Sequence, residues 1–298
     1  MLLNCPEPDE AVRRNGGMGS QLPEFEDPPV VEVALSAQFE PLSSLGSPQM
    51  GLIWQHFRSR FPNTEEHAPL DPVIEEFGAA REPPQLVRFE MVGRPPTPRC
   101  WFVDPEGTEL IQVQRDRFIH NWRKVKGSEY YPRYEHIRDA FASELVDFEN
   151  LLAKEHLGEL VPNQCEVRYV NHILAGKGWD RLGQMGDVLS VCAAACSDDF
   201  LPEPEEGRFA ASYAIHRTGD SPLGRLRVQC HPAYRKSDRK PMFVLTLTAR
   251  GRPIGEGREG VMAFLDLGRE WVVRGFASVT SPAMHIVWGR RDRRSKEY

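Results

Sequence analysis

Long apolar runs are missing from this sequence. Its longest apolar stretches fall far short of the ~18 residues that a membrane-spanning helix needs. The first residues also lack the apolar core of a signal peptide. Both absences argue against a membrane-anchored or secreted protein. The sequence therefore predicts a cytoplasmic protein with no membrane partner.

Cysteine spacing of the metal-binding or disulfide kind is missing too. The six cysteines are scattered, and five lie in or beside apolar stretches, where a reduced Cys behaves as a small hydrophobe. The sequence contains no CxxC pair and no HExxH motif. Cys192 and Cys196 would share one helical turn, but the alanines between them are typical of packing. We therefore expect reduced thiols, no metal and no cofactor.

Catalytic motifs are equally scarce. No GxSxG nucleophile elbow occurs, and neither Gly176-Lys177-Gly178 nor the glycines of 251–260 stand in the frame of a phosphate-binding loop. The sequence thus favours a protein without enzymatic activity. An enzyme stays open as an alternative, with a site assembled from Arg115, His120 and Arg168.

A strong net charge is absent as well. The formal net charge is −6 over 298 residues, which gives no general attraction to nucleic acid. A local basic region keeps a nucleic-acid-associated regulator as the runner-up function. A solvated surface of mixed charge is the commoner reason for such a region, so we expect nucleic acid not to be a partner. The region comprises Arg225, Arg227, Arg235, Lys236, Arg239 and Lys240.

The sequence does contain two similar successions of predicted elements. Each runs strand, helix, three strands and long amphipathic helix, from the periods of apolar residues. The first consists of strand 30–40, helix 51–61, strands 85–92, 99–103 and 109–117, and helix 132–157. The second consists of strand 165–174, a weak helix at 183–195, strands 208–217, 224–231 and 241–250, and helix 257–279.

This order predicts an α+β fold. Consecutive strands joined by short turns favour a mostly antiparallel sheet, with the two long helices on one of its faces. The repeated order predicts an internal duplication with a pseudo-twofold arrangement, which resembles TATA-binding-protein-like and GyrI-like folds. The expected divisions are a disordered tail at 1–27, a first repeat at 28–162, a second repeat at 163–289 and a basic polar tail at 290–298.

Several stretches resemble a sporadically distributed family of bacterial proteins of unknown function. The resemblance covers most of the chain beyond residue 27. It implies a bacterial domain from mobile-element or defence-associated gene neighbourhoods, and it carries no activity and no residue role to this chain. The stretches are PPVVEVALSAQFEPL (28–42), FIHNWRK (118–124), YPRYEHIRDAF (131–141), EVRYVNHI (166–173) and FLDLGREWVVRGFASVTSPAMHIVWGR (264–290).

Two polar clusters are the candidate ligand-binding residues. The first holds Arg115, His120, Asn121, Trp122 and Arg123, where a predicted strand enters a polar turn, and its donors suit a carboxylate, a phosphate or a partner's backbone. Trp122 is expected to be partly exposed, because burying the neighbouring arginines unpaired would be costly.

The second cluster lies on one predicted strand and holds Arg168, Asn171 and His172. Strand alternation places Arg168 and His172 on one face and Asn171 on the other. A buried Asn must satisfy its amide, so we expect Asn171 to bond across the two repeats. The leading hypothesis is a non-enzymatic binding module that engages a protein or a small ligand through the sheet face or the cleft between the repeats.

Overall fold

Alternating apolar residues build one large antiparallel sheet in the computed structural model, which describes residues 21–78, 97–193, 198, 200–216 and 221–291. The strand order is β3-β4-β5-β6-β2-β7-β10-β9-β8, and every neighbouring pair is antiparallel. The strands are β2 (Val30–Phe39), β3 (Asn63–His67), β4 (Arg99–Val103), β5 (Glu109–Gln114), β6 (Arg117–Arg123), β7 (Pro162–Leu174), β8 (Phe209–Ile215), β9 (Gly224–Tyr234) and β10 (Pro241–Gly251).

Helices supply the second layer. The described helices are α1 (Ser47–Phe57), α2 (Arg133–Lys154), α3 (Met185–Val188), the 3-10 turn η1 (Ser190–Cys192), α4 (Gly257–Val279) and α5 (Pro282–Val287). A short ribbon of β1 (Glu24–Phe25) and β11 (Arg290–Arg291) completes the element list. The predicted α+β class with a large, mostly antiparallel sheet is therefore confirmed.

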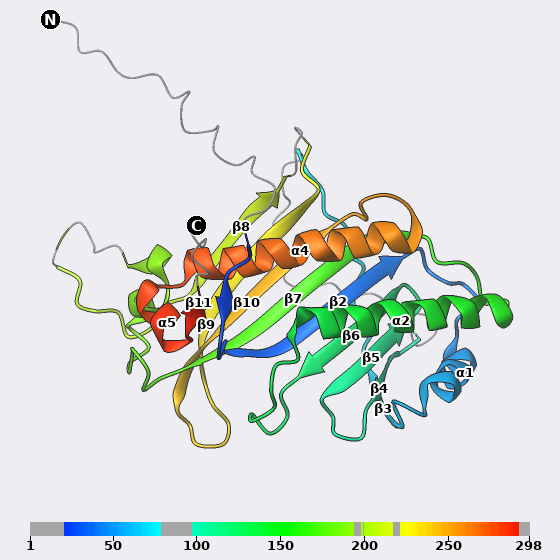
Figure 1. Ribbon diagram of the computed structural model, residues 1–298, viewed down its shortest axis with the longest axis horizontal. Coiled ribbons are helices and arrows are strands. Elements are labelled where there is room, and N and C mark those ends of the chain that lie inside the picture. The colour runs from blue at the N-terminus through cyan, green and yellow to red at the C-terminus, as the bar shows by residue number, and fades with distance from the viewer. Residues whose placement is uncertain (1–20, 79–96, 194–197, 199, 217–220, 292–298) are drawn as a thin grey trace, which may run out of the picture.

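Both α2 and α4 lie across the same face of the sheet (Figure 1). Helix α2 contacts β6 and β2, while α4 contacts β7, β10 and β9. Gly268 lets α4 approach closely, because a Cβ atom there would meet the Val167 side chain at 3.0 Å. The stripe that faces the sheet from α2 is entirely buried and consists of Ile137, Phe141, Leu145, Phe148 and Leu152.

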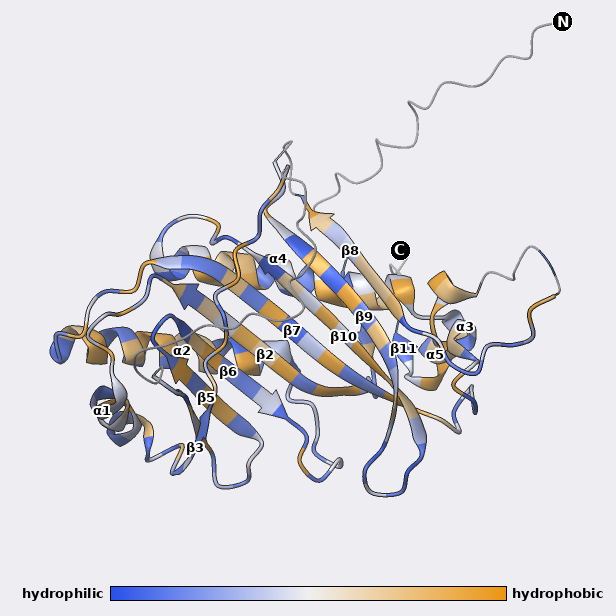
Figure 2. Ribbon diagram, turned by 180° about the vertical axis from the view of Figure 1, so that it is seen from behind, coloured by the Kyte–Doolittle hydropathy of each residue, from blue (hydrophilic) through white to orange (hydrophobic). Residues whose placement is uncertain are grey.

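The two faces of the sheet differ in chemistry. The face under the helices is apolar, and its side chains form the main core. The opposite face, which we call the helix-free face, presents polar and charged side chains in alternation with that core, and the segment after β3 crosses it (Figure 2). A strand that is apolar on one side and polar on the other produces this contrast.

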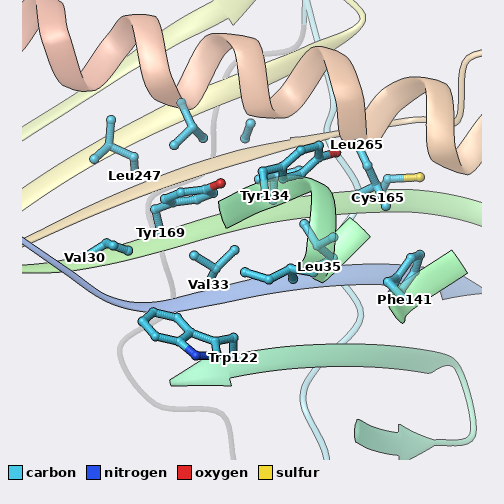
Figure 3. Close-up of a cluster of buried hydrophobic side chains, with 14 of the residues drawn as sticks. Val30, Val33, Leu35, Trp122, Tyr134, Phe141, Cys165, Tyr169, Leu247 and Leu265 are labelled. Carbon is cyan, nitrogen blue, oxygen red and sulfur yellow. The ribbon is translucent and has the colours of Figure 1, made fainter. Parts of the chain in front are cut away.

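The structure corrects the sequence prediction around Trp122. The chain turns at Arg115 and Asp116, and 117–123 forms the seven-residue strand β6 rather than a polar turn. Trp122 is 3% exposed and points into the layer between the sheet and the helices, beside Val33 (Figure 3). The prediction that Trp122 is partly exposed is therefore wrong.

Other boundaries differ as well. The predicted disordered tail was expected to reach residue 27, but residues 21–27 are described and Phe25 is buried in the core. Strand β3 lies between the predicted helix 51–61 and the predicted strand 85–92, where no strand was expected. The predicted strand at 85–92, residues 1–20 and residues 292–298 lie outside the described residues.

Candidate functional site

The first predicted cluster does not form one site, because β6 sends alternate side chains to opposite faces of the sheet. His120 and Trp122 point toward the helices. On the helix-free face, the Asn121 side chain bonds to Gln112. Arg123 donates from Nε to the Gly107 carbonyl, and Arg115 donates to the carbonyls of Leu42 and Ser43.

His120 belongs to a buried ionic network. Its Nδ1 lies 2.7 Å from an oxygen of Glu144 on α2, and both side chains are fully buried. The second Glu144 oxygen accepts a 2.7 Å bond from Arg60, whose side chain is half exposed. His120 Nε2 has no hydrogen-bond partner among the described residues. These contacts tie α2 to the sheet and leave no access for a ligand.

The second predicted cluster is also divided between the two faces, as strand alternation predicts. Arg168 is exposed on the helix-free face, where His172 lies half-buried. Burial, with a smaller contribution from His231, lowers the pKa of His172. Asn171 lies on the helix side and donates to the Leu245 carbonyl of β10. The expected bond between repeats is wrong, because both partners belong to the second predicted repeat.

The two faces each carry a hollow. The helix-side hollow, which we call the inter-helix pocket, lies between α2 and α4 and has a volume of about 260 Å³. Its lining is contributed by the N-terminal segment, the start of α2, strands β2, β7 and β10, and α4. The residues are Pro23, Glu24, Phe25, Pro28, Val30, Tyr131, Arg133, Glu135, Tyr169, Asn171, Leu247, Arg269, Val272, Val273 and Phe276.

The N-terminal segment closes one side of the inter-helix pocket. The Phe25 ring packs edge-on against Phe276 of α4 at 5.3 Å and also against Trp288 at 6.2 Å. Arg133 at the start of α2 donates to the carbonyls of Phe25 and Glu26. The segment is thus fixed to both long helices, so it is part of the pocket wall.

The backbone of Arg133 is strained. Its φ is +73°, a left-handed conformation that non-glycine residues seldom adopt. The guanidinium lies 5.9 Å from the Tyr130 ring and 5.7 Å from the Tyr131 ring. Strain of this kind collects at functional sites, and here it directs a cationic side chain to the pocket rim.

Two tyrosines and an arginine make the polar end of the inter-helix pocket. The Tyr131 and Tyr169 hydroxyl oxygens lie 3.0 Å apart. Burial is the largest cause that raises the pKa of each phenol, and Arg269 opposes it for both. Both hydroxyls are therefore protonated at neutral pH, so the pair has one proton left over for a further acceptor.

Arg269 of α4 completes this end. Its guanidinium lies 4.8 Å from the Tyr134 ring centre and 3.3 Å from a carboxylate oxygen of Glu135, which is largely exposed. The Arg269 Nε atom is buried and has no hydrogen-bond acceptor among the described residues. The polar end therefore combines the Arg269 guanidinium and the two tyrosine hydroxyls with an apolar wall of Phe25, Val272 and Phe276.

Sequence reasoning named Asn171 but missed the other residues of this site. Tyr131, Tyr169 and Arg269 lie far apart in the chain, and each fits a predicted helix or strand without appearing unusual. Asn171, a predicted residue, lines the pocket, and the ring of Trp122, another, lies 5.4 Å from that of Tyr131. The one usable signal was the run Tyr130-Tyr131-Pro132-Arg133, which places two aromatic rings and a cation at the start of a helix.

Charged groups of the predicted basic region are partly neutralised within the chain. Arg225 and Arg227 pair with Glu75, and Arg235 pairs with Asp238. Over the described ranges, no three His, Cys, Asp or Glu side chains gather to hold a metal ion. No helix in those ranges is long and apolar enough to cross a membrane.

Comparison of the chain with family models, with curated proteins and with solved structures found no match. The resemblance to a sporadically distributed bacterial family therefore stays a prediction, and the geometry of the molecule carries the functional argument.

Proposed function

We propose that this protein is a binding module whose ligand is a small amphipathic molecule with a carboxylate head. The observation that carries the proposal is the meeting of the Arg269 guanidinium with the Tyr131 and Tyr169 hydroxyl pair in the pocket lining. A carboxylate accepts such donors in a charge-assisted manner. The apolar wall of the inter-helix pocket then receives the body of the ligand.

The size of the pocket limits the ligand. A volume of about 260 Å³ corresponds to roughly nine water molecules at ~30 Å³ each. It lies just below the usual range of ligand pockets, ~300–1,000 Å³. A chain of about ten non-hydrogen atoms therefore suits the pocket. Octanoate is a suitable probe of this size.

Octanoate is expected to bind more tightly than octanol or octylamine. A hydrogen bond to a charged group contributes about 1.5–3 kcal/mol, which corresponds to roughly a tenfold to hundredfold preference over the alcohol. Arg269→Gln should remove this preference. Isothermal titration calorimetry with the three probes measures it directly.

Two further variants control the titration. Arg258→Gln changes another arginine of α4, which pairs with Glu149 away from the pocket, and it should bind octanoate like the wild type. Val273→Phe fills the apolar end and should weaken all three probes together. The proposal fails if octylamine binds as well as octanoate, or if Arg258→Gln loses as much affinity as Arg269→Gln.

We further propose that the chain is an internal duplication, with the inter-helix pocket at the junction of its halves. Strand order supports this: β2 and β7 lie side by side at the centre, β6, β5 and β4 follow outward on one side, and β10, β9 and β8 follow on the other. A long helix ends each half. TATA-binding-protein-like and GyrI-like folds are the analogy for this arrangement.

Superposition of 30–157 on 165–279 tests the duplication. We expect α2 to coincide with α4, β2 with β7, and β6 with β10 in one rotation. If no single rotation aligns these three pairs, the halves are not repeats, although the pocket and its proposed ligand are unaffected.

A further inference from the structure

The helix-free face already holds one extended polypeptide segment, which we call the crossing segment (70–77). Its backbone is bound by glutamine side chains of the sheet. The Gln114 amide both accepts from the Leu70 N–H and donates to the Leu70 carbonyl, each at 3.0 Å. Gln38 accepts from the Val73 N–H at 3.0 Å. The crossing segment traverses the face in Figure 2.

An acidic side chain is the anchor of the crossing segment. Glu75 is 2% exposed, and its carboxylate is paired with both Arg225 and Arg227 of β9. The Glu75 N–H donates to the Gln164 side chain of β7. The Arg225 guanidinium also lies 4.6 Å from the Phe77 ring centre. This face therefore binds an extended chain in two ways. Glutamine side chains of the sheet bond to the backbone of the chain, and arginine side chains pair with its carboxylate.

The same chemistry continues beyond Glu75, where no described residue covers the sheet. A hollow of about 610 Å³ opens over β7, β10, β9 and β8. Arg168 and Arg208 line it and are exposed, and neither side chain makes a hydrogen bond or an ion pair with any residue in the described ranges. Arg168 and Arg227 both stand opposite Thr248, so they are two strand spacings apart, roughly 10 Å.

We propose that this hollow binds an extended acidic segment of a partner polypeptide, in the way in which the face binds the crossing segment. Arg168 and Arg208 take the carboxylates, while Gln229, Thr246 and Thr248 supply hydrogen bonds to the backbone. Charge complementarity selects the occupant, because these two cations have no counter-ion among the described residues.

A polypeptide fits this hollow better than a nucleic acid does. Proteins that hold single strands stack bases on several aromatic rings along a basic groove. The lining holds two aromatic rings, Phe209 and His231, and no tryptophan or tyrosine. The carboxylate of Glu166 in the lining is paired with Arg250, so it leaves Arg168 and Arg208 without a counter-ion in the described part of the chain.

Fluorescence anisotropy with labelled probes tests the proposal. The probes are a peptide of about twelve residues with alternating Glu and Ser, its Lys and Ser counterpart, and an oligothymidylate of about twelve nucleotides. We expect the acidic peptide alone to bind, with an affinity that falls as salt is added. The double variant Arg168→Ala/Arg208→Ala should weaken its binding roughly tenfold or more.

The matched control is Arg58→Ala/Lys154→Ala, which removes two exposed cations. Arg58 directly follows α1, and Lys154 is the last residue of α2. It should bind the acidic peptide within about twofold of the wild type. Equal losses in both double variants, or tighter binding of oligothymidylate than of the acidic peptide, would overturn the proposal. Octanoate binding should be unchanged in Arg168→Ala/Arg208→Ala. The proposal for the hollow can therefore fail while the proposal for the inter-helix pocket stands, and the reverse.

Discussion

Trp122→Ala is expected to lower the free energy of unfolding by about 3–5 kcal/mol, the usual cost of truncating a core tryptophan. The Trp122 side chain is 3% exposed, and its ring packs against Tyr131. Truncation leaves a cavity that the sheet cannot close, because β6 is hydrogen-bonded on both sides. Urea denaturation followed by far-UV circular dichroism measures the change.

Phe200 provides the control for this prediction. It is 85% exposed, so Phe200→Ala should change the free energy of unfolding by no more than about 0.5 kcal/mol. A Trp122→Ala protein as stable as Phe200→Ala would contradict the burial of Trp122 and would restore the exposed turn that the sequence had indicated.

Glu144→Leu is expected to destabilise the protein by a similar amount, about 3–5 kcal/mol. The substitution leaves His120 buried with neither ring nitrogen bonded to a side chain. It also removes the acceptor of Arg60, which matters less because the Arg60 side chain is half exposed. Removing one partner of a buried pair costs more than the pair itself contributes.

The double variant His120→Leu/Glu144→Leu shows whether the loss of stability in Glu144→Leu comes from the unpaired His120 or from altered packing. Replacing both members of a buried pair with apolar groups is often neutral, so the double variant should be more stable than Glu144→Leu alone. Glu149→Ala on the same helix removes only a surface ion pair with Arg258 and should cost at most about 1 kcal/mol. If the two leucine substitutions add, the His120–Glu144 contact has no energetic importance.

The long helices and most strands were predictable because each depends on a local period. The stripe from Ile137 to Leu152 fixed helix α2, and the alternation in residues 241–250 fixed β10. Those patterns repeat every 3.6 or two residues, so they are visible in one segment of chain. The same local reasoning led to the α+β class with an antiparallel sheet.

Residues 117–123 show where local reasoning stopped. Phe118, His120 and Trp122 alternate with Arg117, Ile119 and Asn121, but a histidine on the apolar side and an isoleucine on the polar side disguise the strand. His120 is tolerated there because Glu144, 24 residues away, bonds to it inside the core. A partner on another element cannot be read from the strand itself.

The inter-helix pocket could not be predicted as a site for the same reason, because it depends on contacts between distant segments. Phe25, Tyr131, Tyr169 and Arg269 come from four separate segments, and only the packing of α2 and α4 on one sheet face brings them together. Phe25 lay in a region expected to be disordered, because seven ordered residues after a long polar stretch carry no periodic signal.

Intermolecular nuclear Overhauser effects between octanoate and the protein test the central claim most directly. The account predicts that the octanoate chain shows contacts with the methyl groups of Val272 and Val273 and with the Phe276 ring, in the wild type and not in Val273→Phe. Contacts with side chains elsewhere, or the absence of any contact at saturating octanoate, would contradict a carboxylate ligand in the inter-helix pocket.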